Sequence, residues 1–341
     1  METLRLEIDG CGIDLVTNEA RLRDRLTRYF GRWIERDPAR QAKIRIVALE
    51  RPTLALDVDW APRLPEPGRA RIEEESIDLP DGRLVLERRT GMVFAFGGDL
   101  HLVVGRCLRN SNQVMNFVND RYVQWRLSRG YLLAHAGAVA QDGRCIALCG
   151  PPGAGRSTAA LRLVAEGLDF VSSDRLLMRP SEYGVQVVGT PKHPRVNPGT
   201  ILSIPALEGT IGPTDRIRLK ALPAEELAAL EHEYDVLVED VEGAGRFATQ
   251  GHLAALVVFN WDPARGEPTA REVDLSVQPE LLPFVMQSPG LFYEPDRERD
   301  VDLSPGRYLD VLSRRPVIEI TGRRDFDAAA RIAREVLERY T

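Results

Sequence analysis

Apolar and polar positions alternate over short stretches in the first third of the chain. This period of two predicts β-strands, which we expect at residues 4–8, 43–49, 83–88, 92–96 and 100–104. The last three strands are spaced for an antiparallel meander. Helical spacing predicts a helix over residues 18–34, with Asn18 as its N-cap. Residues 62–71 are rich in proline and charge, which predicts a loop. We therefore expect a small α+β domain over residues 1–118.

A second pattern covers residues 119–341, which we expect to form a second domain. Asp142-Gly143 predicts a hairpin turn between strands at 131–140 and 144–149. Further elements are expected as short strands between 171 and 220, a helix near 223–231, strands at 253–259 and 317–321, and a helix at 325–339. A helix over 112–129 precedes them. Its apolar stripe of Val114, Phe117, Val118, Tyr122 and Trp125 predicts core packing.

Composition narrows the class of protein. The 341 residues suffice for about two domains. Hydrophobic residues make up 43% of the chain and the net charge is −6, which argues against nucleic-acid binding as the main function. The N-terminus lacks a signal-peptide pattern, and no apolar run approaches the roughly 20 residues that a membrane-spanning helix needs. We expect no membrane association.

The four cysteines bear on the expected cellular compartment of the protein. Cys145 and Cys149 lie an even number of residues apart on one expected strand, so we predict that they share a face as small core residues. The cysteines and histidines do not have the spacing of a zinc site. Reduced cysteines fit a cytoplasmic protein best.

A glycine-rich segment carries the main chemical signal. It follows an expected strand and opens an expected helix, and it consists of Gly150, Pro151, Pro152, Gly153, Ala154, Gly155, Arg156, Ser157 and Thr158. The spacing is that of a phosphate-binding loop, with Arg156 in the position of the usual lysine. Backbone N–H groups and the helix start would face an anion, and Ser157 would supply a hydroxyl to Mg²⁺. The alternative is a tight strand-to-helix turn that binds nothing.

The surroundings of this loop resemble those of HPr kinase/phosphorylase. In both, a strand-borne histidine, here in His135-Ala-Gly-Ala-Val139, precedes the loop. In that family an Asp-Asp pair follows the loop's helix, and the corresponding segment here retains only Asp174, between Ser173 and Arg175. The resemblance implies a carboxykinase-like P-loop core, a mixed β-sheet flanked by helices, after the N-terminal domain.

The chain is more closely similar to the group called HprK-related kinase B. The similarity is carried by Asn119-Asp-Arg-Tyr-Val-Gln-Trp125, Arg129-Gly-Tyr131, the segment from Pro191 to Thr200 and the segment from Leu230 to Val236. Members of this group tend to be encoded beside an ATP-grasp protein and a small amphipathic-helix protein. The resemblance implies these two as pathway partners.

Candidate roles follow from the residue types and from the resemblance. Asp174 would orient or deprotonate an acceptor hydroxyl, or hold Mg²⁺, unless it only caps a turn. His135 would bond a phosphate or the catalytic acid, although a histidine on an apolar strand is more often a core residue. Lys192 and Arg195 would clamp a transferring phosphate or an acidic substrate, unless they lie on a solvated loop. Asp262 is a rival acid.

Together these features predict an ATP-dependent kinase that uses ATP and Mg²⁺. Its acceptor would be a hydroxyl of a peptide, a protein or a small molecule. The replacement of lysine by Arg156 and the loss of one acid leave a second hypothesis open, a nucleotide-binding partner with weak or no catalysis. A third is a phosphorylase or phosphatase that runs the transfer in reverse.

Overall fold

The protein divides into two compact units in a computed structural model that describes residues 1–37, 41–53, 56–62, 74–223, 226–227, 230, 232–241, 247–295 and 301–340. The first unit is Met1–Trp125 with Pro289–Arg299, and the second is Arg126–Ser288 with Asp300–Thr341. The expected boundary after residue 118 falls inside α2 (Ser111–Leu127). Each unit combines helices with a mixed sheet, which confirms the α/β class expected from the sequence.

The first unit is built on one sheet, in which β3 pairs in parallel with β2 and β8 and the other neighbours are antiparallel. In sheet order its strands are β1 (Glu2–Ile8), β2 (Cys11–Thr17), β3 (Ile44–Glu50), β8 (Leu100–Gly105), β7 (Met92–Gly97), β6 (Gly82–Glu87), β5 (Glu74–Leu79) and β4 (Ala61–Pro62). The predicted meander of β6, β7 and β8 is confirmed. The loop expected at 62–71 lies outside the described residues from residue 63 onward.

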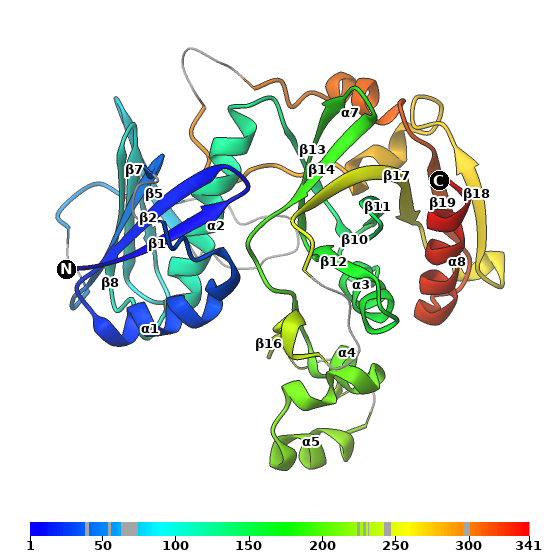
Figure 1. Ribbon diagram of the computed structural model, residues 1–341, viewed down its shortest axis with the longest axis horizontal. Helices are drawn as coiled ribbons and strands as arrows, with labels where there is room; N and C mark the ends of the chain where they lie inside the picture. The colour runs from blue at the N-terminus through cyan, green and yellow to red at the C-terminus, as the bar shows by residue number, and fades with distance from the viewer. Residues whose placement is uncertain are drawn as a thin grey trace. The chain divides into compact units, whose positions relative to one another are not determined.

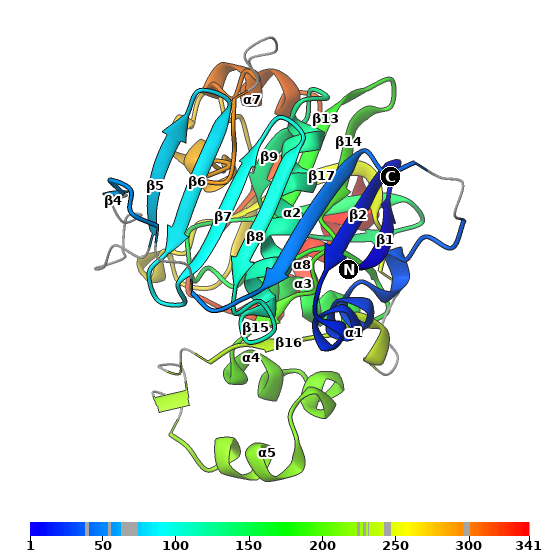
Figure 2. The same ribbon diagram turned by 90° about the vertical axis from the view of Figure 1, so that its left-hand side faces the viewer.

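Two helices accompany this sheet (Figure 1). α2 lies against one face of the sheet, where Phe117 packs on Phe94 and Phe96 with ring centroids 5.3 and 6.0 Å apart (Figure 2). The predicted core role of the apolar stripe holds for Val114, Phe117, Val118 and Tyr122, all buried, whereas Trp125 is only half-buried.

The first helix is shorter than expected. α1 (Ala20–Tyr29) is followed by the short helix η1 (Gly31–Trp33), and its N-cap is Glu19, whose carboxylate accepts from the Arg21 N–H. Asn18 was therefore wrongly assigned as the cap. Its side-chain amide instead exchanges two hydrogen bonds with the backbone of Glu50, at 3.1 and 2.8 Å. A long-range backbone pairing took the place of a local cap.

A segment that follows most of the second unit in sequence returns to the first. The Gln124 amide donates to the Glu294 carbonyl (2.6 Å) and accepts from the Glu294 N–H (2.9 Å). Buried Arg121 donates to the Phe292 carbonyl and lies over the rings of Phe96 and Phe117. Burial lowers the pKa of Arg121 to about 10, because desolvation disfavours the charge. This segment therefore completes the core of the first unit.

The second unit has a sheet in which β11 and β19 both run parallel to β17. Along the main path its strands are β12 (Asp169–Ser172), β10 (Gly137–Gln141), β11 (Arg144–Cys149), β17 (Gln250–Phe259), β14 (Gly184–Gly189), β13 (Arg175–Ser181) and β9 (Leu132–His135). β19 (Val317–Thr321) lies beside β17, and β18 (Thr269–Val273) pairs with the far side of β19 in antiparallel orientation. The strands predicted around 253–259 and 317–321 are confirmed.

The predicted hairpin turn is confirmed, because Asp142 and Gly143 both take positive φ, 50° and 77°. The single strand expected over 131–140 is wrong. The chain breaks at Ala136, where β9 pairs with β13 and β10 pairs with β11 and β12. At the break, the Ala136 N–H donates to the carbonyl oxygen of Asp174 at 3.0 Å. This break places His135 beside Asp174.

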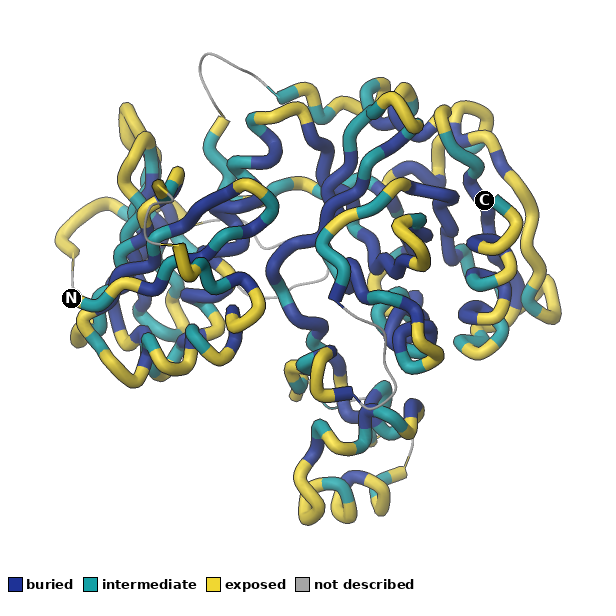
Figure 3. The backbone as a smooth tube through the Cα atoms, viewed as in Figure 1, coloured by how far each residue is buried: buried dark blue, intermediate teal, exposed yellow. Residues whose placement is uncertain are grey.

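Helices cover both faces of this sheet (Figure 1). α3 (Arg156–Ala165) and α8 (Phe326–Arg339) pack together on one face, and α7 (Pro305–Leu312) with η5 (Pro279–Phe284) lies on the other. Cys145 and Cys149 share one face as predicted, in the core cluster that includes α7, and burial raises the pKa of each to about 12. The strands between these layers are buried along most of their length (Figure 3). Among the described residues no helix is long and apolar enough to cross a bilayer.

A helical subregion interrupts the second unit between β14 and β17. It contains β15 (Arg195–Val196), α4 (Pro198–Ser203), η2 (Pro205–Thr210), α5 (Pro213–Lys220), β16 (Tyr234–Asp235) and η3 (Val238–Asp240). The expectation of short strands up to residue 220 is therefore wrong after β15. α4, η2 and α5 each begin at a proline, the favoured first helical residue, and this signal was not used in the prediction from sequence. Much of the helix expected near 223–231 lies outside the described residues.

Candidate functional site

The glycine-rich segment forms the predicted turn between β11 and α3. Gly155 is the N-cap of α3 with a φ of 91°, and a Cβ there would overlap the ring of Phe326. Gly150 also has positive φ and lies against the Phe259 carbonyl. The Trp261 indole N–H donates to the Ala154 carbonyl at 2.8 Å and holds the turn. The turn is thus fixed by its own glycines and by the strand end beside it.

The start of α3 is left available to an anion. Its N-cap is a glycine, so no side chain caps the first turn. The first N–H groups of a helix have no partner within the helix, and the helix dipole adds partial positive charge at the same place. A glycine turn that leads into such a helix start is the arrangement that cradles phosphates.

Arg156 is the first residue of α3, and its side chain bonds to His135. One guanidinium nitrogen, Nη1, donates to the His135 carbonyl at 2.9 Å, and Nη2 lies 2.7 Å from the ring nitrogen Nε2. Burial lowers the pKa of Arg156, against the opposing influence of Cys149 and Asp174. Neither bond reaches the glycine turn. In this conformation the cation that replaces the usual lysine is held by a histidine.

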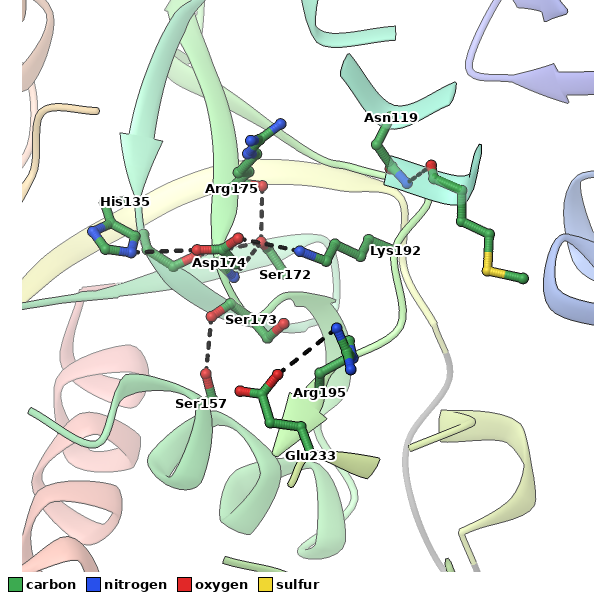
Figure 4. Close-up of polar contacts among 12 residues, drawn as sticks. Asn119, His135, Ser157, Ser172, Ser173, Asp174, Arg175, Lys192, Arg195 and Glu233 are labelled. Atoms are coloured by element: carbon green, nitrogen blue, oxygen red, sulfur yellow. Dashed lines mark hydrogen bonds and ion pairs between the residues drawn. The ribbon is translucent and has the colours of Figure 1, made fainter. Parts of the chain in front are cut away.

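Asp174 lies in the turn between β12 and β13, between His135 and Lys192 (Figure 4). Its carboxylate oxygens are 3.3 Å from His135 Nε2 and 3.4 Å from Lys192 Nζ, and about a third of the side chain is exposed. Burial by itself would raise the pKa of Asp174. When His135 Nε2 carries a proton, the hydrogen bond that it donates, together with the charges of Lys192 and Arg175, outweighs burial and holds that pKa well below its usual range. Asp174 is therefore a carboxylate at neutral pH.

Arg156 and Asp174 compete for the same nitrogen of His135. Nε2 can accept from Arg156 only if it carries no proton, and it can donate to Asp174 only if it carries one. Both hydrogen bonds cannot exist together. The shorter contact, 2.7 Å against 3.3 Å, is the one with Arg156. Release of Arg156 would therefore allow His135 to donate to Asp174.

Two hydroxyl groups connect the start of α3 to its neighbours. Ser157 Oγ donates to the Ser173 carbonyl at 3.1 Å, directly before the acid (Figure 4). Thr158 Oγ1 lies 3.0 Å from the hydroxyl of Thr200 on α4. The Ser157 bond joins the glycine turn and the Asp174 turn into one candidate site.

The donor set fits a magnesium ion that is shared with phosphates. In the described part of the chain, three or more His, Cys, Asp or Glu side chains never gather as a metal cluster. Magnesium in nucleotide sites commonly takes one or two carboxylates, and phosphate oxygens and water complete its six ligands. Ser157 Oγ and the Asp174 carboxylate would supply the protein ligands of such an ion.

The other predicted site residues are placed differently. Lys192 joins Asp174, as described, whereas Arg195 on β15 pairs with Asp235 at 3.2 Å and Glu233 at 3.8 Å. The rival acid Asp262 caps η4 (Pro263–Arg265) and pairs with Arg265 at 3.1 Å. The structure thus brings together the glycine turn, Arg156, His135, Asp174 and Lys192. Trp261 and Phe326, which hold the turn, carry no sequence signal that points to it.

Comparisons with known proteins add little to this geometry. No protein-family model matches the chain, and no curated protein matches it. Among solved structures, the Hpr(Ser) kinase/phosphatase from Coxiella burnetii matches with 11% sequence identity and a TM-score of 0.30, over 61% of this chain and 95% of that one. So low a score carries no argument about ancestry or activity. The similarity to HprK-related kinase B stays a prediction from the sequence motifs.

Proposed function

We propose that the protein is an ATP-dependent phosphotransferase that moves the γ-phosphoryl group to a hydroxyl of a peptide, a protein or a small molecule. One observation carries the proposal: the glycine turn at the uncapped start of α3 is joined to the Asp174 turn through the bond from Ser157 to the Ser173 carbonyl. A site for phosphate and a carboxylate for the acceptor would therefore lie next to each other, on two turns that are joined by a hydrogen bond.

The binding half of the site follows from its donors. The α- and β-phosphates would lie on the N–H groups of Gly153 and of residues 155–158, in line with the dipole of α3, because the Ala154 N–H already donates to the Pro151 carbonyl. Mg²⁺, held by Ser157 and Asp174, would neutralise phosphate charge when bound. Lys192, which already lies beside Asp174, is the second cation of the site. Its position suits the charge of the transferring group.

The catalytic half rests on Asp174. Because its pKa is lowered, it is a weak base and is ionised over the neutral range. Phosphoryl transfer depends mainly on positioning and charge stabilisation, so a carboxylate that accepts a hydrogen bond from the acceptor hydroxyl can direct the attack. His135 and Lys192 would hold this carboxylate in place. We therefore assign Asp174 to orientation more than to deprotonation.

Arg156 must leave His135 before it can contact a phosphate. Its two bonds to His135 would be exchanged for charge-assisted bonds to phosphate oxygens. His135 Nε2 would then no longer have to accept from Arg156, and in the tautomer that carries the hydrogen on Nε2 it could donate to Asp174. Nucleotide binding would in this way give the Asp174 carboxylate a hydrogen bond from His135.

The second candidate is a nucleotide-binding protein with weak or no turnover. The observation that favours it is the same pairing of Arg156 with His135, because it withdraws the cation that the loop normally offers. The turn between β12 and β13 also offers a single carboxylate, that of Asp174 between Ser173 and Arg175. With two carboxylates, one could bind the metal and the other the acceptor hydroxyl. Binding without transfer in the presence of a competent acceptor would favour this candidate.

Nucleotide binding is tested with two matched glycine variants. Gly155→Ala places a methyl group into the Phe326 ring at the start of α3, and we expect ATP affinity to fall at least about tenfold. Gly167→Ala puts the same strain, a positive φ of 97°, at the far end of α3, where a Cβ meets open space. Calorimetric titration with ATP and Mg²⁺ should separate the two variants. Equal affinity in both would remove the phosphate-binding turn from the account.

A further inference from the structure

An arginine-lined pocket lies in the first unit, whereas the glycine turn belongs to the second. It is open, encloses about 620 Å³, and is formed where β3 ends, where the chain enters α2 and along α1. Its lining consists of Arg25, Glu50, Arg51, Pro52, Arg106, Leu108 and Arg109. Four guanidinium groups and one carboxylate therefore share one surface of a chain whose net charge is −6.

The charge of this pocket is only partly neutralised within the described residues, because the single carboxylate of Glu50 is set against four guanidinium groups. The side chains of Arg51, Arg106 and Arg109 are exposed, and none of them takes part in an ion pair or hydrogen bond there. The one carboxylate, Glu50, is committed to the loop, since it accepts from the Leu108 N–H at 2.7 Å. Clustered like charges repel one another, so this arrangement costs stability unless an anion binds it.

Part of the pocket is pre-organised. Arg25 reaches from α1 and donates to the Leu108 carbonyl and to Ser111 Oγ, both at 3.1 Å. Ser111 is buried and opens α2, a helix of 17 residues, so the positive end of that helix dipole adds to the arginine charge. These contacts hold the loop of residues 105–110 against α1.

We propose that this pocket binds an acidic peptide segment of a partner protein. Guanidinium forks pair with carboxylates in two-pronged geometry. The four arginines come from three separate segments, so an extended chain with several Asp or Glu side chains can reach more of them than a single small anion can. Leu108 and Pro52 supply apolar contact between the charges. A nucleic acid would extend past the pocket onto an acidic protein, which disfavours it.

The test uses a fluorescein-labelled hexaglutamate peptide and fluorescence anisotropy, at low and at physiological ionic strength. The pocket variant is Arg51→Ser with Arg106→Ser. The matched control is Arg314→Ser with Arg324→Ser, which removes the same charge from exposed positions in the second unit. We expect the pocket variant to bind at least about fivefold more weakly than the control, which should match the wild type, and added salt to weaken all binding.

Three outcomes would overturn the proposal: no binding by wild type, equal loss in both variants, or preference for an oligonucleotide of equal charge over the peptide. Circular dichroism of both variants checks that the fold is retained. If the Arg51→Lys and Arg106→Lys pair recovers part of the affinity, charge in the pocket is the cause. None of these outcomes depends on nucleotide binding, so the result is separate from the fate of the phosphotransferase proposal.

Discussion

Removal of the His135 ring should tighten nucleotide binding, an unusual result for a site residue. In the wild type, Arg156 must give up its contact with Nε2 before it can reach a phosphate. His135→Ala removes that contact in advance and keeps the second one, which Arg156 makes with the backbone carbonyl of residue 135. The change therefore isolates one hydrogen bond from a charged donor.

The size of the effect follows from that bond. A hydrogen bond to a charged group contributes about 1.5 kcal/mol at the lower end of its range. Since roughly 1.4 kcal/mol corresponds to a tenfold change in affinity, ATP should bind up to about tenfold more tightly to His135→Ala. Turnover should fall in the same variant, because Asp174 loses the donor that would position it. Tighter ATP binding together with slower turnover would show that the contact between Arg156 and His135 exists only before the nucleotide binds.

Isothermal titration calorimetry with ATP and Mg²⁺ measures the first half of this prediction. His252→Ala is the control, because His252 is exposed on β17 and its ring packs against that of Tyr183. If His135→Ala weakens binding as much as Arg156→Ala does, His135 itself contacts the nucleotide. If affinity does not change, Arg156 does not exchange partners, and the reasoning fails.

Three further predictions concern stability. The native pKa of Asp174 lies below that of an unfolded aspartate, so its carboxylate stabilises the fold above the ordinary carboxyl pH range and loses that effect as the pH falls toward the native pKa. Asp174→Asn should therefore reduce the loss of unfolding free energy at acid pH, which urea titrations at several pH values measure. Arg121→Ala should lower the free energy of unfolding by about 3 kcal/mol through a cavity among aromatic rings, and Arg121→Met should recover most of it in the same assay. The Glu319 side chain is only 2% exposed, pairs with Arg271 at 2.6 Å and accepts from Asn260 at 2.7 Å. Arg271→Ala leaves this buried carboxylate without its cation, so it should lower the free energy of unfolding by about 3 kcal/mol, more than Glu319→Gln does, as measured by thermal unfolding.

Local chemistry made part of the fold predictable. Asp142-Gly143 specifies a turn that only residues tolerant of positive φ adopt, and the hairpin followed. The glycine turn was likewise predictable, because strand, turn and helix start are adjacent in sequence. The helix expected at residues 325–339 is a third such case, since its start is fixed locally by the Asp325 carboxylate, which accepts from the Asp327 and Ala328 N–H groups.

Long-range contacts decided what the sequence could not. The break at Ala136 depends on the Asp174 carbonyl, 38 positions along the chain, and on strand partners that no local pattern names. The return of the segment around Phe292 to the first unit rests on Arg121 and Gln124, whose roles appear only after folding. The pairing of Arg156 with His135 is of the same kind. A motif gives the position of the cation but not its resting partner.

Phosphoryl transfer itself is tested most directly by conversion of ATP to ADP in long incubations with Mg²⁺. Wild type and Asp174→Asn are compared, each with binding measured in parallel, and water or an added hydroxyl compound serves as acceptor. The account predicts slow ADP formation by wild type and a loss of about 10²-fold or more in Asp174→Asn, with nearly unchanged ATP affinity. Equal ADP formation by both proteins, or tight binding by wild type without any ADP, would contradict it.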